Sequence, residues 1–199
     1  LPVRFNPEKK NIVYAGRGGK DLANALRIIF GGFSILTKRN PGVFSNVHFY
    51  FIGTSYAAAG KGQHTILPVA EEFGLQSYVT EITDRVRFFD VLSLLKKADM
   101  LVVPGSADES YTASKIYPYL LAGKPLLAVF NERSSVLKVL EDVSFGETVA
   151  YKNELPFNTY TIDCAAKIEA LISGSSARLI PDEKKLYPYT AESNARLQV

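Results

Sequence analysis

Residues 99–130 read DMLVVPGSADESYTASKIYPYLLAGKPLLAVF, and this stretch decides the fold class. The runs 99–105 and 125–130 have the length of strands and no alternation of polar and apolar residues. Such runs are typical of strands that are covered on both faces. Between them, residues 113–122 have the spacing of a helix that ends at Gly123. A buried strand, a helix and a second buried strand predict a parallel crossover unit.

The same alternation continues along the 199-residue chain. Further strands are expected at 11–15, 47–53, 78–82 and 147–151, and further helices at 22–39, 66–74, 88–98, 134–143 and 163–173. Right-handed crossovers then give an α/β fold, a Rossmann-like, doubly wound parallel sheet of about six strands in three α/β/α layers. We assign residues 1–175 to this domain and residues 176–199 to a C-terminal connection and a truncated crossover helix.

Composition excludes several function classes. Apolar residues make up 47% and charged residues 22% of the chain, which is typical of a folded globular domain. The net charge of +3 is carried by scattered lysines, so we expect no nucleic-acid partner. The single cysteine, Cys164, excludes an intrachain disulfide and a cysteine-rich metal site, and we predict no metal. The chain starts at Leu1, and we expect it to be part of a longer protein.

The loop after the first strand is the first candidate site, because ligands bind at the carboxyl ends of strands in open parallel sheets. It consists of Gly16, Arg17, Gly18, Gly19, Lys20 and Asp21. The glycines allow close backbone approach, the following helix offers free N–H groups, and two cations add positive charge. We predict a phosphate site here, with Asp21 as the helix N-cap. The alternative is a simple tight turn.

The loops after the fourth and second strands supply the other candidates. Asp108 and Glu109 precede a hydroxyl-rich helix start, where Ser114 and Lys115 could hold a second anion. A carboxylate there suits a sugar hydroxyl, since it accepts strong charge-assisted hydrogen bonds. Gly53 begins a loop that either walls the same pocket or is only a surface loop.

These segments resemble a known family. GRGGKDL after the first strand, FIG at the end of the second and SKIYPYLLAGKPLLAVF at 114–130 resemble the C-terminal domain of GT-B glycosyltransferases, specifically retaining family 4. Members often carry K-x-x-E-Y-L-A-x-G-K-P. The matching residues here are Lys115, Tyr119, Leu120, Gly123, Lys124 and Pro125.

The resemblance implies a role for each matched residue. Arg17 and Lys20 would contact the donor diphosphate, and Glu109 or Asp108 would hold the donor sugar. Arg17, Lys20 and Glu109 are thus the candidate catalytic residues. The candidate binding residues are Gly16, Gly18, Gly19, Gly53, Asp108, Ser114 and Lys115. Pro118 stands where the family has a glutamate that binds the nucleotide ribose.

The resemblance also implies an activity. The whole protein would transfer a sugar from a nucleotide-diphosphate sugar to an acceptor held by a missing N-terminal domain, with no other cofactor. It implies polysaccharide biosynthesis in the cytoplasm, with peripheral association at the inner face of the membrane. The fragment alone would bind nucleotide without turnover. The alternatives are a non-catalytic nucleotide-binding or interaction domain, which Pro118 favours, and another GT-B enzyme such as a sugar-nucleotide epimerase or a phosphorylase.

Overall fold

One six-stranded parallel sheet organises the chain. The computed structural model describes residues 3–108, 115–178, 182–190 and 193. The strands are β1 (Lys10–Ala15), β2 (Val47–Ile52), β3 (Val79–Ile82), β4 (Met100–Pro104), β5 (Leu126–Asn131) and β6 (Glu147–Tyr151). Their order is β3-β2-β1-β4-β5-β6, and every neighbouring pair is parallel. This is the doubly wound Rossmann order, so the predicted fold class is confirmed.

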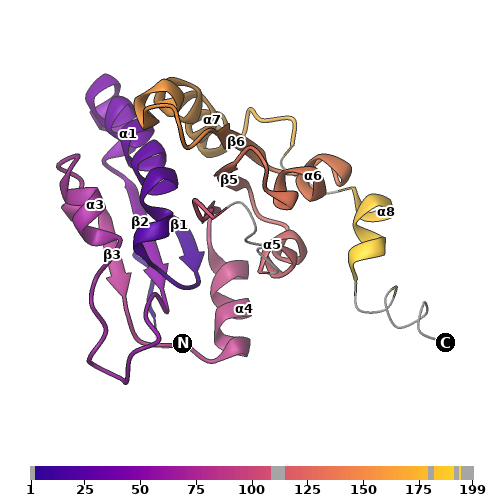
Figure 1. Cartoon of the computed structure of the whole chain (residues 1–199), viewed down its shortest axis with the longest axis horizontal. Coiled ribbons are helices and arrows are strands. Elements are labelled where there is room, and N and C mark those ends of the chain that lie inside the picture. Colours follow the sequence, from indigo (N-terminus) through magenta and orange to yellow (C-terminus); the bar gives the residue numbers. More distant parts are fainter. Residues whose placement is uncertain (1–2, 109–114, 179–181, 191–192, 194–199) are drawn as a thin grey trace.

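Helices cover both faces of the sheet (Figure 1). The longer ones are α1 (Ala23–Arg39), α4 (Phe88–Lys97), α5 (Ile116–Ala122), α6 (Ser135–Asp142) and α7 (Thr161–Ser173); the short ones are α2 (Pro41–Phe44), α3 (Leu67–Glu71) and α8 (Glu183–Leu186). Single 3-10 turns occupy Lys20–Leu22, Gln76–Tyr78, Phe157–Tyr160 and Tyr187–Tyr189. The helices α1, α3 and α7 pack on one face, and α4, α5 and α6 on the other.

The central strands are buried because helices cover them from both sides. Every residue of β4 and β5 is buried, which explains why neither strand alternates in sequence. Under α1, Phe30 and Phe33 meet the rings of Phe49 and Phe51 edge to face. These contacts fix the register of β2 beneath the helix, since a one-residue slip would turn both rings to the other face.

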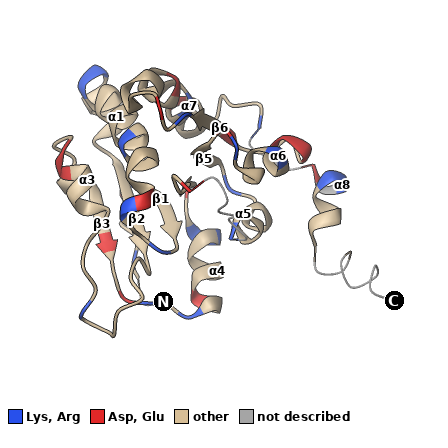
Figure 2. Ribbon diagram, in the orientation of Figure 1, with Lys and Arg blue, Asp and Glu red and all other residues tan. Residues whose placement is uncertain are grey.

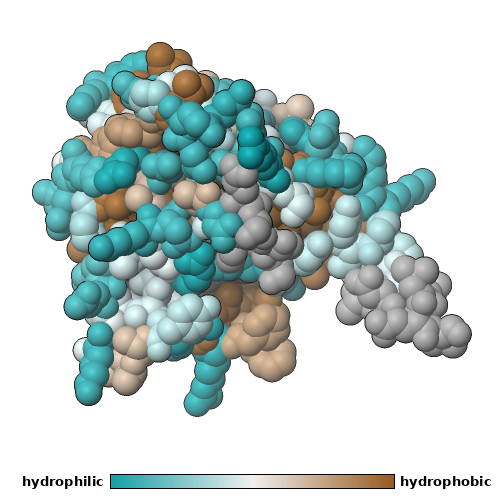
Figure 3. Space-filling view, in the orientation of Figure 1, coloured by the Kyte–Doolittle hydropathy of each residue, from teal (hydrophilic) through white to brown (hydrophobic). Residues whose placement is uncertain are grey.

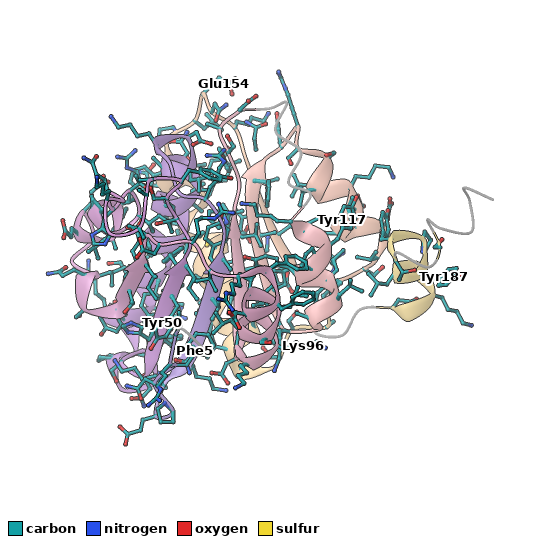
Figure 4. The ribbon with its side chains drawn as sticks, turned by 90° about the horizontal axis from the view of Figure 1, so that it is seen from below. Phe5, Tyr50, Lys96, Tyr117, Glu154 and Tyr187 are labelled. Atoms are coloured by element: carbon teal, nitrogen blue, oxygen red, sulfur yellow. The ribbon has the colours of Figure 1, made fainter. Side chains whose placement is uncertain are left out.

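The segment before β1 covers the opposite face of β2. The rings of Phe5 and Tyr50 lie side by side with centroids 4.9 Å apart, as Figure 4 also shows. The Asn6 N–H donates to the Tyr50 hydroxyl at 3.1 Å. A short segment before β1 therefore covers this part of the sheet, as helices cover the other strands.

Several predicted boundaries differ from the observed ones. The helix expected at 66–74 is only one turn and a half, Leu67–Glu71, before the chain turns at Gly74. The helix expected from 163 begins at Thr161. Of the helix expected at 113–122, the described part starts at Ile116 and ends at Gly123, which is left-handed with φ 61°. The division at residue 175 stays a prediction, although Tyr189 stacks on Tyr117 with centroids 5.7 Å apart.

Glycines in the middle of α1 allow α7 to approach closely. A Cβ on Gly32 would lie 3.0 Å from the Ala165 nitrogen and 3.1 Å from the Thr161 oxygen, which are backbone atoms of α7. A Cβ on Gly31 would lie 2.6 Å from the Thr161 methyl group. The helix continues through both glycines, so they serve close packing and not a kink.

We expect Gly32→Val to lower the free energy of unfolding by about 1–3 kcal/mol, because the added methyl groups force α1 and α7 apart. Urea unfolding followed by circular dichroism measures the change. Gly42→Val is the matched control, since a Cβ there would lie 3.9 Å from the Asn40 side chain, an ordinary van der Waals distance. Equal losses in the two variants would contradict the packing role of Gly32.

Candidate functional site

The candidate site lies where the strand order reverses. Strands β1 and β4 are neighbours, but the chain leaves β1 towards α1 and leaves β4 towards α5, on opposite faces. Their loops diverge and leave a crevice at the carboxyl ends of the strands, where ligands of open α/β sheets bind. In Figure 1 this edge is the lower one, towards which the arrows of β1 and β3 point.

The glycine loop after β1 packs tightly against the loop after β2. The N–H groups of Gly16 and Gly18 donate to the carbonyls of Ile52 and Thr54 at 2.9 and 2.7 Å, and the Gly19 N–H donates to Thr65 Oγ1 at 3.1 Å. A Cβ on Gly18 would lie 2.4 Å from Thr65 Oγ1. These three N–H groups are used within the protein, so the glycines allow close backbone packing and the charge for a ligand comes from side chains.

Asp21 holds Arg17 in place. The guanidinium donates from Nη1 to Oδ1 at 2.8 Å and from Nη2 to Oδ2 at 2.5 Å. Ser106, at the end of β4, donates its hydroxyl to Oδ2 at 2.6 Å. The Arg17 guanidinium lowers the pKa of Asp21 to about 2. The prediction of Asp21 as helix N-cap was wrong, because the helical segment begins with a 3-10 turn at Lys20 whose N-cap is Gly19, and Asp21 lies inside that turn with its carboxylate on Arg17 and Ser106. Figure 2 shows basic and acidic residues adjacent where α1 begins.

Lys115 approaches the same loop from α5. Its ammonium group donates to the Tyr14 hydroxyl at 3.2 Å, and that hydroxyl donates to the Arg17 carbonyl at 2.8 Å. Burial, together with the positive charges of Arg17 and Arg85, lowers the pKa of Lys115 to about 8. One turn further, the Tyr119 hydroxyl accepts from the Ala15 N–H at 2.7 Å and anchors α5 to the end of β1.

A cavity of about 320 Å³ opens between these elements. Its walls are Ala15, Gly16, Arg17, Ile52, Gly53, Tyr56, Arg85, Val86, Phe88, Val91, Leu92, Leu95, Lys115, Pro118 and Tyr119. Three of these side chains are cations, and Arg85 also lies over the Tyr56 ring, 4.6 Å from its centroid. Most of the others are apolar. The arrangement suits a ligand with an anionic end and an apolar body, since charges act strongly beside apolar walls.

The predicted site residues fall into three groups. Gly16, Arg17, Gly53 and Lys115 line the cavity together. Gly18, Gly19, Lys20 and Asp108 are not part of its lining, and Lys20 and Asp108 are exposed. Glu109 and Ser114 lie outside the described residues.

Sequence reasoning missed the roles of two residues of the site. Asp21 was placed as a cap, although its i,i+4 spacing from Arg17 could have indicated the ion pair. Arg85 lies in the loop after β3, where a cation at a carboxyl end was a signal, whereas Tyr56 belongs to the loop after Gly53 that was expected either to wall the pocket or to be a surface loop. Their position at one cavity depends on the strand order, which the sequence did not specify.

A buried carboxylate shapes the wall behind the glycine loop. Glu81, on β3, accepts the Thr54 hydroxyl at 2.8 Å and the N–H groups of Thr65, Ile66 and Leu67 at 2.8 to 3.1 Å. It therefore fixes the long loop after β2 and satisfies the first N–H groups of α3.

Among the residues that the structure describes, no cluster of three or more His, Cys, Asp or Glu side chains could hold a metal ion. Within the same residues, none of the helices has both the length and the apolar character needed to cross a bilayer.

Comparisons with known proteins agree with this fold. No family model and no curated protein sequence matches the chain. Among solved structures, the N-terminal domain of Candida albicans trehalose-6-phosphate phosphatase is 19% identical, with a TM-score of 0.61 over 91% of this chain and 38% of that one. WaaG, a glycosyltransferase involved in lipopolysaccharide biosynthesis, is 15% identical, with a TM-score of 0.56 over 84% of this chain and 41% of that one.

A third structure is close to this chain in length. The C-terminal domain of LpcC, a glycosyl transferase group 1 family protein from Francisella tularensis, is 14% identical, with a TM-score of 0.55 over 90% of this chain and 78% of that domain. The first two matches show that the chain spans well under half the length of those proteins. At these identities the likeness establishes the fold alone, which this chain shares with the C-terminal domain of LpcC.

We expect Asp21→Asn to lower the free energy of unfolding near pH 6 by about 1 kcal/mol, a modest value because solvent screens this partly exposed pair. The pKa of Asp21 is about 2 in the folded chain, below the ordinary value of 3.8 for this carboxyl group. The contribution of the ionised Asp21 carboxylate to the free energy of unfolding is therefore nearly complete above about pH 4, and it disappears as the pH falls towards 2. Urea unfolding at pH 6 and pH 3 measures it.

The control is Asp142→Asn, which removes the exposed partner of Lys138. We expect this variant to change stability less than Asp21→Asn at pH 6. A loss of stability in the Asp21 variant that is as large at pH 3 as at pH 6 would contradict the assignment.

Proposed function

We propose that this chain is the donor-binding half of a glycosyltransferase resembling retaining family 4. The donor would be a nucleotide-diphosphate sugar, and a preceding N-terminal domain would hold the acceptor. The observation that carries the proposal is the convergence of Arg17, Arg85 and Lys115 on one cavity at the carboxyl edge of a GT-B half-domain. As the resemblance implies, we propose a role in polysaccharide biosynthesis, in the cytoplasm at the inner face of the membrane.

The chemistry of transfer explains the cations. When the sugar leaves, negative charge builds on the departing diphosphate. Arg17 is already oriented by Asp21, so its guanidinium needs little reorganisation as that charge develops. Lys115 would add a second charge from the opposite wall, and exposed Lys20 would reach the diphosphate from outside.

A non-catalytic nucleotide-binding domain is the second candidate. Pro118 lines the cavity at the position where the family glutamate would bind ribose, and it offers no acceptor side chain. The Asp21 carboxylate also competes with phosphate for Arg17. Both observations favour weak nucleotide binding, and binding without transfer would support this candidate.

Calorimetric titration with UDP, GDP and their sugar conjugates tests nucleotide binding. We expect one nucleotide to bind saturably, and an Arg17→Ala, Lys20→Ala double variant to bind it about tenfold or more weakly, because charge-assisted hydrogen bonds to phosphate are lost. Lys38→Ala is the control, since Lys38 is exposed in the last turn of α1, at the other edge of the sheet. Binding by none of the nucleotides would refute the proposal.

The pH dependence of nucleotide binding tests Lys115 separately. Its pKa of about 8 means that it is charged below that pH and neutral above it. We expect the affinity for the nucleotide to stay nearly constant between about pH 6 and 7 and to fall several-fold by about pH 9, because Lys115 loses its charge. Lys115→Arg keeps its charge over this range and should remove the decline. The same decline in wild type and variant would exclude Lys115 as its cause.

A further inference from the structure

An apolar groove adjoins the cation-lined cavity between α4 and α5. It measures about 470 Å³ and is lined by Phe88, Phe89, Leu92, Ser93, Lys96, Pro118, Leu121 and Ala122. Three of the apolar side chains are strongly exposed: Phe88 at 62%, Phe89 at 79% and Leu121 at 54%. Figure 3 shows hydrophobic atoms projecting at the lower edge of the molecule, where α4 begins in Figure 1. Exposed aromatic side chains gathered along one groove mark a binding surface.

The groove and the cavity meet at three side chains. Phe88, Leu92 and Pro118 line both of them. On the cavity side, the nearest charged groups are the cations Arg85, Arg17 and Lys115. On the groove side, the polar side chains in the lining are Ser93 and Lys96, and the Ser93 hydroxyl donates to the Phe89 carbonyl at 2.9 Å. The cavity has three cations in its lining and the groove has one, Lys96, so the path from the cavity to the groove runs from strongly positive to mainly apolar.

This gradient restricts what can fill both spaces. A ligand group with several hydroxyls would lose water in the groove and find few partners there, which is unfavourable. A hydrocarbon chain would gain by covering the exposed phenylalanine and leucine side chains. Burial and the neighbouring cations Arg17 and Arg85 lower the pKa of Lys115, and the Asp21 carboxylate, which is paired with Arg17, opposes this shift only in part.

We propose that the cavity and the groove together bind an amphiphilic phosphate, a prenyl or similar hydrocarbon chain that ends in a phosphate or diphosphate. The phosphate end meets Arg17, Arg85 and Lys115, and the chain passes Pro118 and lies along Leu121 and Phe89. This inference rests on the proposed function in assigning phosphate to the same cations. It adds a class of ligand that competes with the nucleotide for them.

Titration of the chain with farnesyl diphosphate, inorganic pyrophosphate and UDP tests the inference. We expect farnesyl diphosphate to bind about tenfold or more tightly than pyrophosphate, because the hydrocarbon covers apolar surface, and to displace UDP. Phe89 and Leu121 line the groove but not the cavity. Phe89→Ser and Leu121→Ser should therefore each weaken the binding of farnesyl diphosphate several-fold and leave the binding of pyrophosphate unchanged. Ile162→Ser on α7, where Ile162 is 76% exposed, is the matched control and should change neither.

Three results would overturn the inference: farnesyl diphosphate binds no more tightly than pyrophosphate, Ile162→Ser weakens its binding as much as Phe89→Ser does, or UDP binds and farnesyl diphosphate does not displace it. Phe89-dependent binding to phosphatidylglycerol vesicles with no affinity for farnesyl diphosphate would assign the groove to a bilayer instead. If UDP binds while farnesyl diphosphate gains nothing over pyrophosphate, this inference fails and the proposed function stands. If UDP fails to bind and farnesyl diphosphate binds through the groove, the proposed function fails.

Discussion

The carboxylate of Asp21 joins the two loops on which the site depends. Its side chain accepts from Arg17 and Ser106, and its backbone carbonyl accepts from the Ala107 N–H at 2.8 Å. Because β1 and β4 send their chains to opposite faces, these hydrogen bonds hold the two loops together at the point where they diverge. The ion pair is partly shielded and reinforced by the serine, which is the setting in which a charge-assisted contact orients a side chain well. The crevice thus has a fixed wall before any ligand arrives.

That internal anion also sets the electrostatics of the cavity. Arg17 shares its charge with Asp21, whereas Lys115 donates to the neutral Tyr14 hydroxyl and Arg85 stacks on Tyr56. The cavity therefore stays electropositive although one of its cations is paired. Its apolar walls strengthen any interaction of these charges with an anion, since water cannot screen them fully. Pro118 extends the apolar surface to the groove beyond.

The sequence predicted the fold well and the site only in part. Strands β4 and β5 show no alternation of polar and apolar residues, which predicted helices on both faces of the sheet. Gly123 marked the end of α5. The loop after β1 was found through its glycines and cations. The role of Asp21 was misjudged, because a residue at a helix start has several possible partners, and the Ser106 hydroxyl that competes for it lies 85 residues away.

Local pattern by itself determined the elements, their order along the chain and the parallel class of the sheet. The local pattern could do so because the periodicity of a strand or a helix depends on the spacing of apolar residues that are close in sequence. Only the tertiary structure decided that Arg17, Arg85 and Lys115 share one cavity, and that Phe89 and Leu121 share one groove. The physical reason is that these residues come from different crossover units. Their distances follow from the strand order and from the packing of α4 against α5, which no single segment encodes.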